Sequence, residues 1–349
     1  MAATTTGVYH TTYRADLALR HTRIEYVRLV LALAVVVALP FVVSPFWLHV
    51  LDQIGIAVIG AIGLNILVGY TGQISLGQGG FLAVGAYSAG LMATRTDLSP
   101  IVGVLVAVLV TAAVGAFFGL PALRLKGLYL AIATLASQQI IVWLIIHWEF
   151  LTGGVDALVL EPPTVFGWTP TGDKDWYWVI AGFAALATIT ATNLFRTGVG
   201  RAFVAIRDHD IAAEVIGVDP ARYKVLAFAI SSAFVGLAGA LTAYWTQILT
   251  WERFTLDVSI LYLAMIIVGG LGSVAGSIYG AVFMIAIPAY LDQLSLRVSP
   301  DSILATDLPA IKLLIFGLTI VLFLVFEPRG LARIWQRAKD YFRLWPFRY

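Results

Sequence analysis

Residues 196–224 read RTGVGRAFVAIRDHDIAAEVIGVDPARYK, and they are the only long charged stretch between two strongly apolar blocks. Of the 349 residues in the chain, 60% are hydrophobic and 12% are charged, and the mean hydropathy is +0.90. So few polar residues cannot coat a water-soluble globule. The composition therefore predicts an all-α polytopic membrane protein, in which residues 196–224 form an aqueous segment between membrane helices.

Runs without Asp, Glu, Lys or Arg predict the membrane spans, because a helix needs about 20 apolar residues to cross the hydrocarbon core of a bilayer. Two runs are too long for one helix and contain glycine clusters, so each is predicted to form two spans in a Gly-rich, broken hairpin. We expect about ten spans in a single transmembrane domain, residues 29–326. The single spans are 29–51, 98–123, 127–148, 176–195, 225–251 and 309–326, and the double spans are 53–94 and 258–291.

The basic residues predict the orientation, because cytoplasmic loops keep Lys and Arg. Seventeen of the 22 basic residues lie in segments 1–28, 124–126, 196–224 and 327–349, which are therefore predicted to be cytoplasmic, with both termini inside. The segment 149–175 contains five acidic residues and one lysine, and it is predicted to lie on the outer side. It is either a plain connector or a docking surface for an external partner.

The stretch NILVGYTGQISLGQGGFLAVGAY, residues 65–87, combines many glycines with polar side chains. Broken backbone at membrane depth is tolerated where protein or a water-filled cavity satisfies the amide groups. We therefore predict that its polar side chains line a substrate route, although close helix packing would explain them as well. The predicted route residues are Asn65, Gln73, Ser75, Gln78 and Tyr87.

A second stretch, IIVGGLGSVAGSIYGA at residues 266–281, repeats part of this pattern 200 positions later. Gly69, Gly72 and Gly80 align with Gly269, Gly272 and Gly280. Membrane transporters often contain duplicated halves, but Gly-rich sequence also gives chance matches.

Residues 196–224 themselves predict a short amphipathic helix. Its apolar positions are Phe203, Ile206, Ala213 and Ile216, and the polar residues Arg207, Asp208, His209 and Asp210 occupy the intervening positions. Gly217 suits the left-handed position after a helix, whereas Asp219 and Pro220 suit the cap and the first residue of the next one. A plain surface helix would show the same pattern.

Several classes of chemistry are missing from the sequence. There is no cysteine and no G-x-x-x-x-G-K-[ST] phosphate loop, so neither thiolate chemistry nor ATP binding through that loop is expected. No metal-binding histidine pair, nucleophile with a base or carboxylate pair is visible, so we expect no enzyme and no metal site. The predicted spans lack the buried charges of proton-coupled transporters, although sodium coupling could use carbonyl and hydroxyl groups. The few basic residues give no nucleic-acid surface.

Five segments together resemble the permeases of branched-chain amino acid ABC importers, specifically the LivM-type subunit. They are GYTGQISLGQGGFLAVGAYSA at 69–89, LTGG at 151–154, GRAFVAIRDHDIAAEVIGVDPARYKVLAFAISSAFVGLAGAL at 200–241, FTLDVSILYLAMIIVGGLGSVAGSIYGA at 254–281 and FEPRGL at 326–331. The part from residue 200 is the most specific.

The resemblance implies an ATP-driven importer in the bacterial cytoplasmic (inner) membrane. A second related permease, two ATPase subunits and an external substrate-binding protein would be its partners, and ATP would be bound by the ATPases, so the chain itself would need no cofactor. Residues Ala212, Ala213 and Gly217 match the A-A-x-x-x-G part of the loop that docks into the ATPases, which makes the neighbouring charged residues 207–210 part of the coupling site.

Some positions depart from the pattern of this family. Ile211 replaces a common glutamate, Gln139 and Val142 stand where a glutamate and an arginine are expected, and Trp251 replaces a common proline. Similar permeases carry urea, short amides or other small solutes, so these substrates remain an alternative. From other classes, an ion-coupled secondary transporter would explain the spans, and a purely structural subunit would explain the charged loop.

Overall fold

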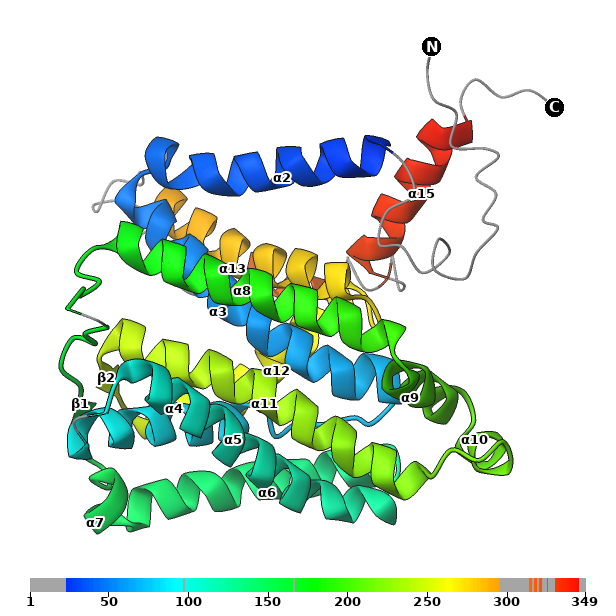
Figure 1. Ribbon diagram of the computed structural model, residues 1–349, viewed down its shortest axis with the longest axis horizontal. Coiled ribbons are helices and arrows are strands. Elements are labelled where there is room, and N and C mark those ends of the chain that lie inside the picture. The colour runs from blue at the N-terminus through cyan, green and yellow to red at the C-terminus, as the bar shows by residue number, and fades with distance from the viewer. Residues whose placement is uncertain are drawn as a thin grey trace.

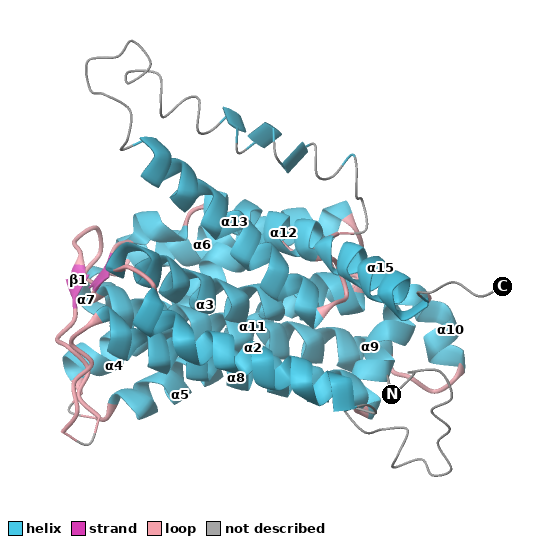
Figure 2. Cartoon of the chain, turned by 90° about the horizontal axis from the view of Figure 1, so that it is seen from above, coloured by secondary structure: helices cyan, strands magenta, loops and turns pink. Residues whose placement is uncertain are grey.

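The computed structural model describes residues 23–96, 98–165, 167–295 and 330–344, together with residues 314–315, 317–318, 320–321 and 325. The long helices lie side by side and run between two ends of one bundle (Figure 1). Viewed from above, the same arrangement leaves the short strands at one end and α9 and α10 at the other (Figure 2). Residues 1–22, 345–349 and most of the predicted span 309–326 lie outside the described residues.

The first long apolar region forms two helices with a break between them. Helix α2, Arg23–Val42, is followed by α3, Pro45–Asn65, and α3 continues into one π-helical turn, η1, Ile66–Tyr70. The break falls at Ser44 because Pro45 occupies the first turn of α3, where its missing amide hydrogen costs nothing. The predicted span 29–51 is therefore wrong in its bounds, and Asp52, taken as a boundary, lies inside α3.

The remaining elements follow in chain order. They are α4 Gln78–Arg95, α5 Pro100–Gly119, η2 Leu120–Leu123, α6 Leu128–His147, α7 Glu149–Thr152, β1 Leu158–Val159, α8 Asp173–Arg196, α9 Gly198–Asp208, α10 Asp210–Val215, α11 Pro220–Thr246, β2 Ile248–Leu249, η3 Trp251–Phe254, α12 Leu256–Gly269, α13 Val274–Ser295 and α15 Leu331–Leu344. The two strands pair antiparallel, with Leu158 opposite Leu249.

Six of the described helices are long and apolar enough to cross a membrane. They are Pro45–Tyr70, Pro100–Leu123, Leu128–His147, Asp173–Arg196, Pro220–Thr246 and Val274–Leu294. The all-α membrane architecture is thus confirmed, but the count of about ten is not supported within the described part of the chain. Helix α12 is too short at 14 residues, and the apolar part of α2 is only Leu33–Val42.

The Gly-rich run at residues 65–87 does not form the predicted hairpin. Residues 72–77 are not helical, and they carry the chain away from α3, so that α3 packs mainly on α8, α11 and α13 while α4 packs on α5 and α11. Gly72 has a φ of +69°, which a residue with a Cβ rarely adopts. The run therefore links two helices that belong to different parts of the bundle.

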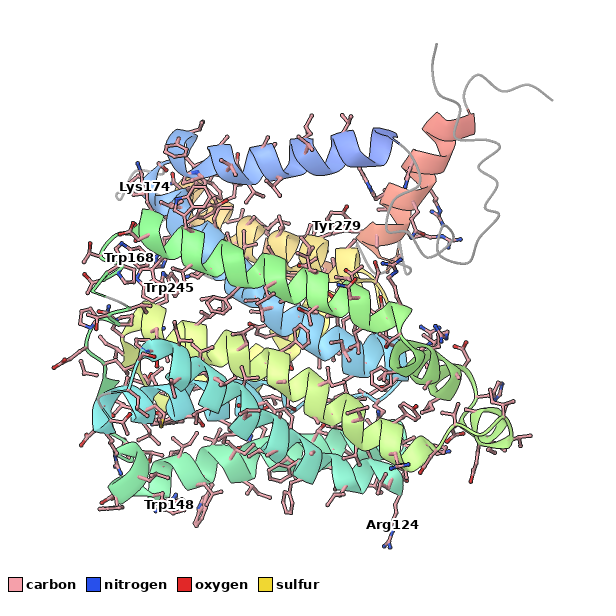
Figure 3. The ribbon with its side chains drawn as sticks, viewed as in Figure 1. Arg124, Trp148, Trp168, Lys174, Trp245 and Tyr279 are labelled. Atoms are coloured by element: carbon pink, nitrogen blue, oxygen red, sulfur yellow. The ribbon has the colours of Figure 1, made fainter. Side chains whose placement is uncertain are left out.

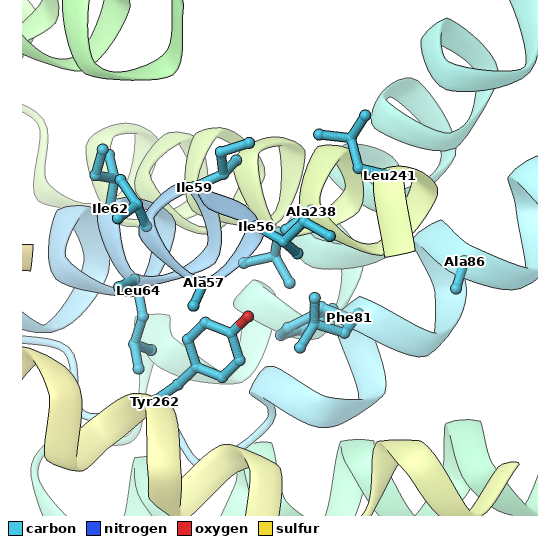
Figure 4. Packing of buried hydrophobic residues seen from close by; sticks show 14 of the residues in the cluster. Ile56, Ala57, Ile59, Ile62, Leu64, Phe81, Ala86, Ala238, Leu241 and Tyr262 are labelled. Carbon is cyan, nitrogen blue, oxygen red and sulfur yellow. The ribbon is translucent and has the colours of Figure 1, made fainter. Parts of the chain in front are cut away.

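Helix α11 lies at the centre, between α3, α4 and α5. On the other side of α3, Tyr262 from α12 points its ring toward Ala57 and Phe81 (Figure 4). Gly60 makes room for this ring, because a Cβ there would lie 3.0 Å or less from three Tyr262 atoms. Small residues thus let the central helices approach closely, as is usual when membrane helices pack without a hydrophobic driving force.

Candidate functional site

The charged segment forms two short helices at one end of the bundle (Figure 1). Thr197 caps α9, and the chain turns at His209, whose φ of −160° and ψ of 105° are extended, before α10 begins. Phe203, Ile206 and Ala213 are buried as the helical pattern predicts. The prediction of one amphipathic helix is wrong at its C-terminal end. The turn at His209 rotates α10 relative to α9, so that the side chain of Ile216 is 74% exposed.

The boundaries after α10 agree with the sequence. Gly217 has a φ of +90°, and no atom lies within 4 Å of a Cβ built on it. Asp219 Oδ1 accepts hydrogen bonds from the amides of Ala221 and Arg222, at 3.0 and 3.3 Å, and Pro220 is the first residue of α11. The predicted left-handed turn and N-cap are therefore confirmed.

Arg207 joins this segment to the first Gly-rich run. Its Nη1 donates a hydrogen bond of 3.1 Å to the carbonyl oxygen of Gly69, in the π-helical turn η1. Gly72 lies against the same side chain, because a Cβ there would be 3.2 Å from Arg207 Cγ. Two segments that are 138 residues apart in sequence are thus in direct contact. The contact links α9 to the end of α3.

A cavity of about 220 Å³ lies at this junction. Its walls come from three places: the run after η1, the link between η2 and α6, and the charged segment. They include Thr71, Gln73, Lys126, Arg207, Asp208, His209, Asp210 and Lys224. The structure therefore brings Gln73, one of the predicted route residues, together with the predicted coupling residues at positions 207–210.

Asp210 ties α10 to the rest of this junction. Its carboxylate forms an ion pair with Lys126 and another, at 3.5 Å, with Lys224, whose side chain is only 10% exposed. The hydrogen bond from Lys126, together with the charges of both lysines, lowers the pKa of Asp210 below its ordinary value. Asp210 therefore stays ionised at physiological pH.

We expect Asp210→Asn to lower the stability of the protein by ~1 kcal/mol, because it leaves the partly buried Lys224 without a counter-charge. A carboxylate with a lowered pKa stabilises the folded protein above its ordinary pKa, and this stability is lost as the pH falls through the lowered pKa. The difference in unfolding free energy between Asp210→Asn and wild type should therefore stay constant from about pH 5 to about pH 8. Thermal unfolding in detergent measures it. Glu214→Gln, an exposed carboxylate in α10, is the control, and an equal loss in both variants would contradict the prediction.

Asn65 fastens the two Gly-rich stretches to each other. Its Nδ2 lies within hydrogen-bonding distance of Ser277 Oγ and of the carbonyl oxygens of Ser273 and Gly270, at 2.8, 2.9 and 3.4 Å. Its Oδ1 accepts a hydrogen bond of 2.9 Å from the amide of Gly272. Every polar atom of this side chain is in use within the protein, which favours a structural role, although its place on the substrate route stays a prediction.

The other predicted route residues lie in different surroundings. Ser75 Oγ accepts from the amide of Gly77, and Gln78 Nε2 donates to the carbonyl oxygen of Gly60 at 3.0 Å. Gln73 Oε1 and the hydroxyl of Tyr87 are buried and have no hydrogen-bond partner among the described residues. Tyr87 faces an apolar cavity of about 650 Å³ between α4, α5 and α6, so the five residues do not form one site.

Sequence reasoning missed two buried polar groups. Asp52 is 0% exposed, and neither carboxyl oxygen has a hydrogen-bond partner in the described structure. Gln138 Oε1 accepts a bond of 2.6 Å from Ser259 Oγ, which in turn accepts from the amide of Gly79 at 2.7 Å. Gln139 is exposed, and it is one of the positions that depart from the family pattern. The signal for Asp52 was its position as a single acid within a long apolar region.

At the end opposite to α9 and α10, a cavity of about 560 Å³ lies between the ends of α3, α8 and α11 and the loop before α8. Trp245 is in its wall, and Trp245, Trp168 and Lys174 lie toward this end of the bundle, whereas Arg124 lies at the other end (Figure 3). Among the residues that the structure describes, no group of three His, Asp or Glu side chains is placed to hold a metal ion.

Comparison with known proteins identifies the family. The family model described as "Branched-chain amino acid transport system / permease component" matches residues 46–324. The permease protein LivM of the high-affinity branched-chain amino acid transport system from Salmonella typhimurium is 33% identical, over 86% of this chain and 73% of that protein, and the LivM protein from Escherichia coli is 32% identical, over 87% and 74%.

A probable branched-chain amino acid transport permease protein LivM from Methanocaldococcus jannaschii is 24% identical over 78% of this chain and 82% of its own. No solved structure matches the chain. The apolar helices, the family match over most of the length and the similarity to LivM proteins agree with one another. The chain belongs to the branched-chain amino acid transport permeases, and it is the membrane-spanning permease subunit of a branched-chain amino acid ABC transporter, not an enzyme.

Proposed function

We propose that this chain and a second related permease form the membrane pathway of an ATP-driven importer. Two ATPase subunits bind the ATP and drive the cycle, and an external binding protein delivers the amino acid, so the chain needs no cofactor of its own. The family supports this assembly, because ABC importers divide transport among such subunits. The transporter lies in the bacterial cytoplasmic membrane, with segments 1–28, 196–224 and 327–349 in the cytoplasm and 149–175 outside.

The arrangement of the ends supports this orientation. The start of α2, helix α15 and the helices α9 and α10 lie at the same end of the bundle, and Lys126 and Arg124 lie there too (Figures 1 and 3). Because basic residues are retained on the cytoplasmic side, this end is the cytoplasmic one. The acidic segment that contains β1 lies at the opposite end.

The contact between Arg207 and Gly69 is the observation that carries the coupling mechanism. The ATPases would move α9 and α10 when they bind ATP, and the hydrogen bond from Arg207 would pass that movement to the π-helical turn at the end of α3. Single π-helical turns inside α-helices are rare, and they occur frequently at functional sites. The Gly-rich runs held by Asn65 would then shift together, and Gln73 would line the cytoplasmic mouth of the route.

An exposed apolar surface on α10 supports docking to an ATPase. Ile211 and Val215 are 73% and 83% exposed, and Ala212 is exposed beside them. Helix α10 lies at the tip of the bundle, beyond the ends of the long helices (Figure 1). An exposed apolar patch in water marks an interaction site. With Ile211 in place of an acid, the dock depends on shape and apolar contact.

We expect Val215→Asp to lower the amount of ATPase that co-purifies with the transporter by about tenfold, because a charge at the centre of an apolar contact loses its water when the subunits dock. Quantitative co-purification from membranes measures this. The control is Val155→Asp, since Val155 is 66% exposed in the outer segment. Normal ATPase recovery with Val215→Asp would contradict the proposed dock.

Ala212 gives a second test of the dock, and Ala213 does not. A bulky residue at Ala212 fills the exposed face, whereas Ala213 is 2% exposed and a bulky residue there would disturb the packing of α10 itself. Ala212→Trp should therefore abolish uptake while leaving the external binding protein able to hold its ligand.

Uptake measurements decide between the proposed importer and its alternatives. Proteoliposomes that contain the full complex should take up leucine, isoleucine and valine only when ATP and the binding protein are present. Uptake of urea or a short amide instead would point to the related solute permeases. Uptake by the purified single chain, driven by an ion gradient, would show a secondary transporter.

A further inference from the structure

The outer cavity of about 560 Å³ contains groups of both charges. Its wall includes Asp173 at the start of α8 and Arg253 in η3, together with the rings of His49, Trp176 and Trp245. Within the described part of the chain, neither Asp173 nor Arg253 has an ion-pair partner. A volume of this size is typical of small-molecule sites. The lining thus offers an acid, a base and apolar ring surfaces in one concave space.

Asp52 adds a buried carboxyl group beside this cavity. It lies one turn after His49 in α3 and next to Gln53, and both of these residues line the cavity. The Trp245 side chain interacts with Asp52, and its ring lies 4.6 Å from that of His49. Neither oxygen of Asp52 has a hydrogen bond of ordinary geometry in the described structure. A buried carboxyl group without a partner is costly and is retained where it has a use.

The backbone of the cavity wall is strained at one point. Gln247 has a φ of +57°, and it is the only described residue other than glycine with a positive φ. Its carbonyl oxygen accepts a hydrogen bond of 2.8 Å from the amide of Leu160, which fixes the loop before α8 against the end of α11. Strained backbone of this kind gathers at ligand sites, where the surrounding structure maintains it.

We propose that this cavity is a binding site on the outer side for a zwitterionic α-amino acid with an apolar side chain. Asp173 faces its ammonium group, Arg253 pairs with its carboxylate, and Trp176 and Trp245 contact its aliphatic part. The site would receive the substrate from the external binding protein before it enters the membrane. This inference rests on the proposed importer and adds the place where its substrate first binds.

The test uses the assembled transporter in nanodiscs without the binding protein, and it measures equilibrium binding of radiolabelled L-leucine. We expect saturable binding to wild type, weakened about tenfold or more by Asp173→Asn and Arg253→Gln, because each removes one charge partner of the ligand. The matched controls are Glu161→Gln and Glu252→Gln, whose side chains lie in the same loops but do not line the cavity.

Two leucine analogues separate a direct contact from a structural effect. In wild type, 4-methylpentanoate lacks the ammonium group and 3-methylbutylamine lacks the carboxylate, so both should compete weakly. In Arg253→Gln, the amine should compete as well as leucine does. In Asp173→Asn, the acid should compete as well as leucine does. A merely misfolded variant would lose all three ligands equally. Positions 173 and 253 are both exposed, so neither substitution disturbs buried packing.

The outcomes distinguish this site from the importer itself. No leucine binding to wild type, or unchanged binding in Asp173→Asn and Arg253→Gln, would overturn the outer site. ATP-driven leucine uptake by the full complex would still support the importer. If the full complex with its binding protein does not import leucine, isoleucine or valine, the proposed importer fails, whatever the cavity binds.

Discussion

Replacing Arg207 with alanine is expected to lower ATP-driven uptake by roughly 10- to 100-fold while leaving the complex assembled. The change removes the hydrogen bond of 3.1 Å from Nη1 to the carbonyl oxygen of Gly69. A hydrogen bond from a charged group contributes about 1.5–3 kcal/mol, which corresponds to this range in an equilibrium between two transporter states. The ATPases would continue to hydrolyse ATP, but their movement would no longer reach the end of α3.

The measurement compares leucine uptake with ATP hydrolysis in the same proteoliposomes, so that uncoupling appears as a change in their ratio. Arg201→Ala is the matched control, because Arg201 lies in the same helix α9. Its guanidinium donates a hydrogen bond of 3.2 Å to the nearby carbonyl oxygen of Arg196 and, among the described residues, none to α3 or η1. The ratio of uptake to ATP hydrolysis in Arg207→Lys should lie between the ratios in Arg207→Ala and Arg201→Ala. Lysine keeps the charge but lacks the planar set of donors with which Arg207 also pairs with Asp208. Wild-type coupling in Arg207→Ala would exclude this route.

The sequence predicts well where the helices at the C-terminal end of residues 196–224 end and begin. Gly217, Asp219 and Pro220 act through backbone conformation and capping, which depend on residues within a few positions of each other. The exposure of Ile216 could not be predicted in the same way. This exposure depends on the turn at His209. The periodicity does not indicate that turn, because the polar residues at positions 207–210 fit one continuous helix as well as two helices with a turn between them.

Asp52 shows why charges are uncertain boundaries for membrane spans. An acid is costly in a helix that faces lipid, so a charge-free run predicts well the helices α5 and α6, whose apolar windows are only 22% and 39% buried in the bundle. Helix α3 is surrounded by protein, and 83% of its apolar window is buried in the bundle. A buried helix can contain an acid beside a cavity, and composition alone does not distinguish the two environments.

The two Gly-rich runs show a further limit. Their similarity suggests a duplication, which stays a hypothesis, but similarity does not predict that they touch. The structure joins them through Asn65, whose contacts in the second run are more than 200 residues away in sequence. Such a contact depends on the packing of α3 against α13, which no local pattern encodes. The same limit applies to Arg207 and Gly69.

Helices α12 and α13 pack backbone against backbone, and this contact gives the second prediction. A Cβ on Gly280 would overlap the carbonyl oxygen of Met265 and lie 3.1 Å from the Cα of Gly269. A Cβ on Gly276 would lie 2.6 Å from the carbonyl oxygen of Gly270. Backbone atoms cannot turn away as a side chain can, so the two helices must separate if either glycine is replaced.

Gly280→Ala is therefore expected to destabilise the protein by about 1–3 kcal/mol, in spite of the higher helix propensity of alanine. Gly182→Ala is the matched control, because Gly182 lies inside helix α8 and no atom lies within 4 Å of its added Cβ. There the propensity acts alone and should stabilise the helix by up to ~1 kcal/mol. Thermal unfolding of the two variants in the same detergent should thus give shifts of opposite sign. Equal stability of the two variants would show that this close contact does not hold the bundle together. Separation of α12 from α13 also moves the turn at Gly270–Ser273, to which Asn65 binds. Gly280→Ala should therefore lower uptake as well.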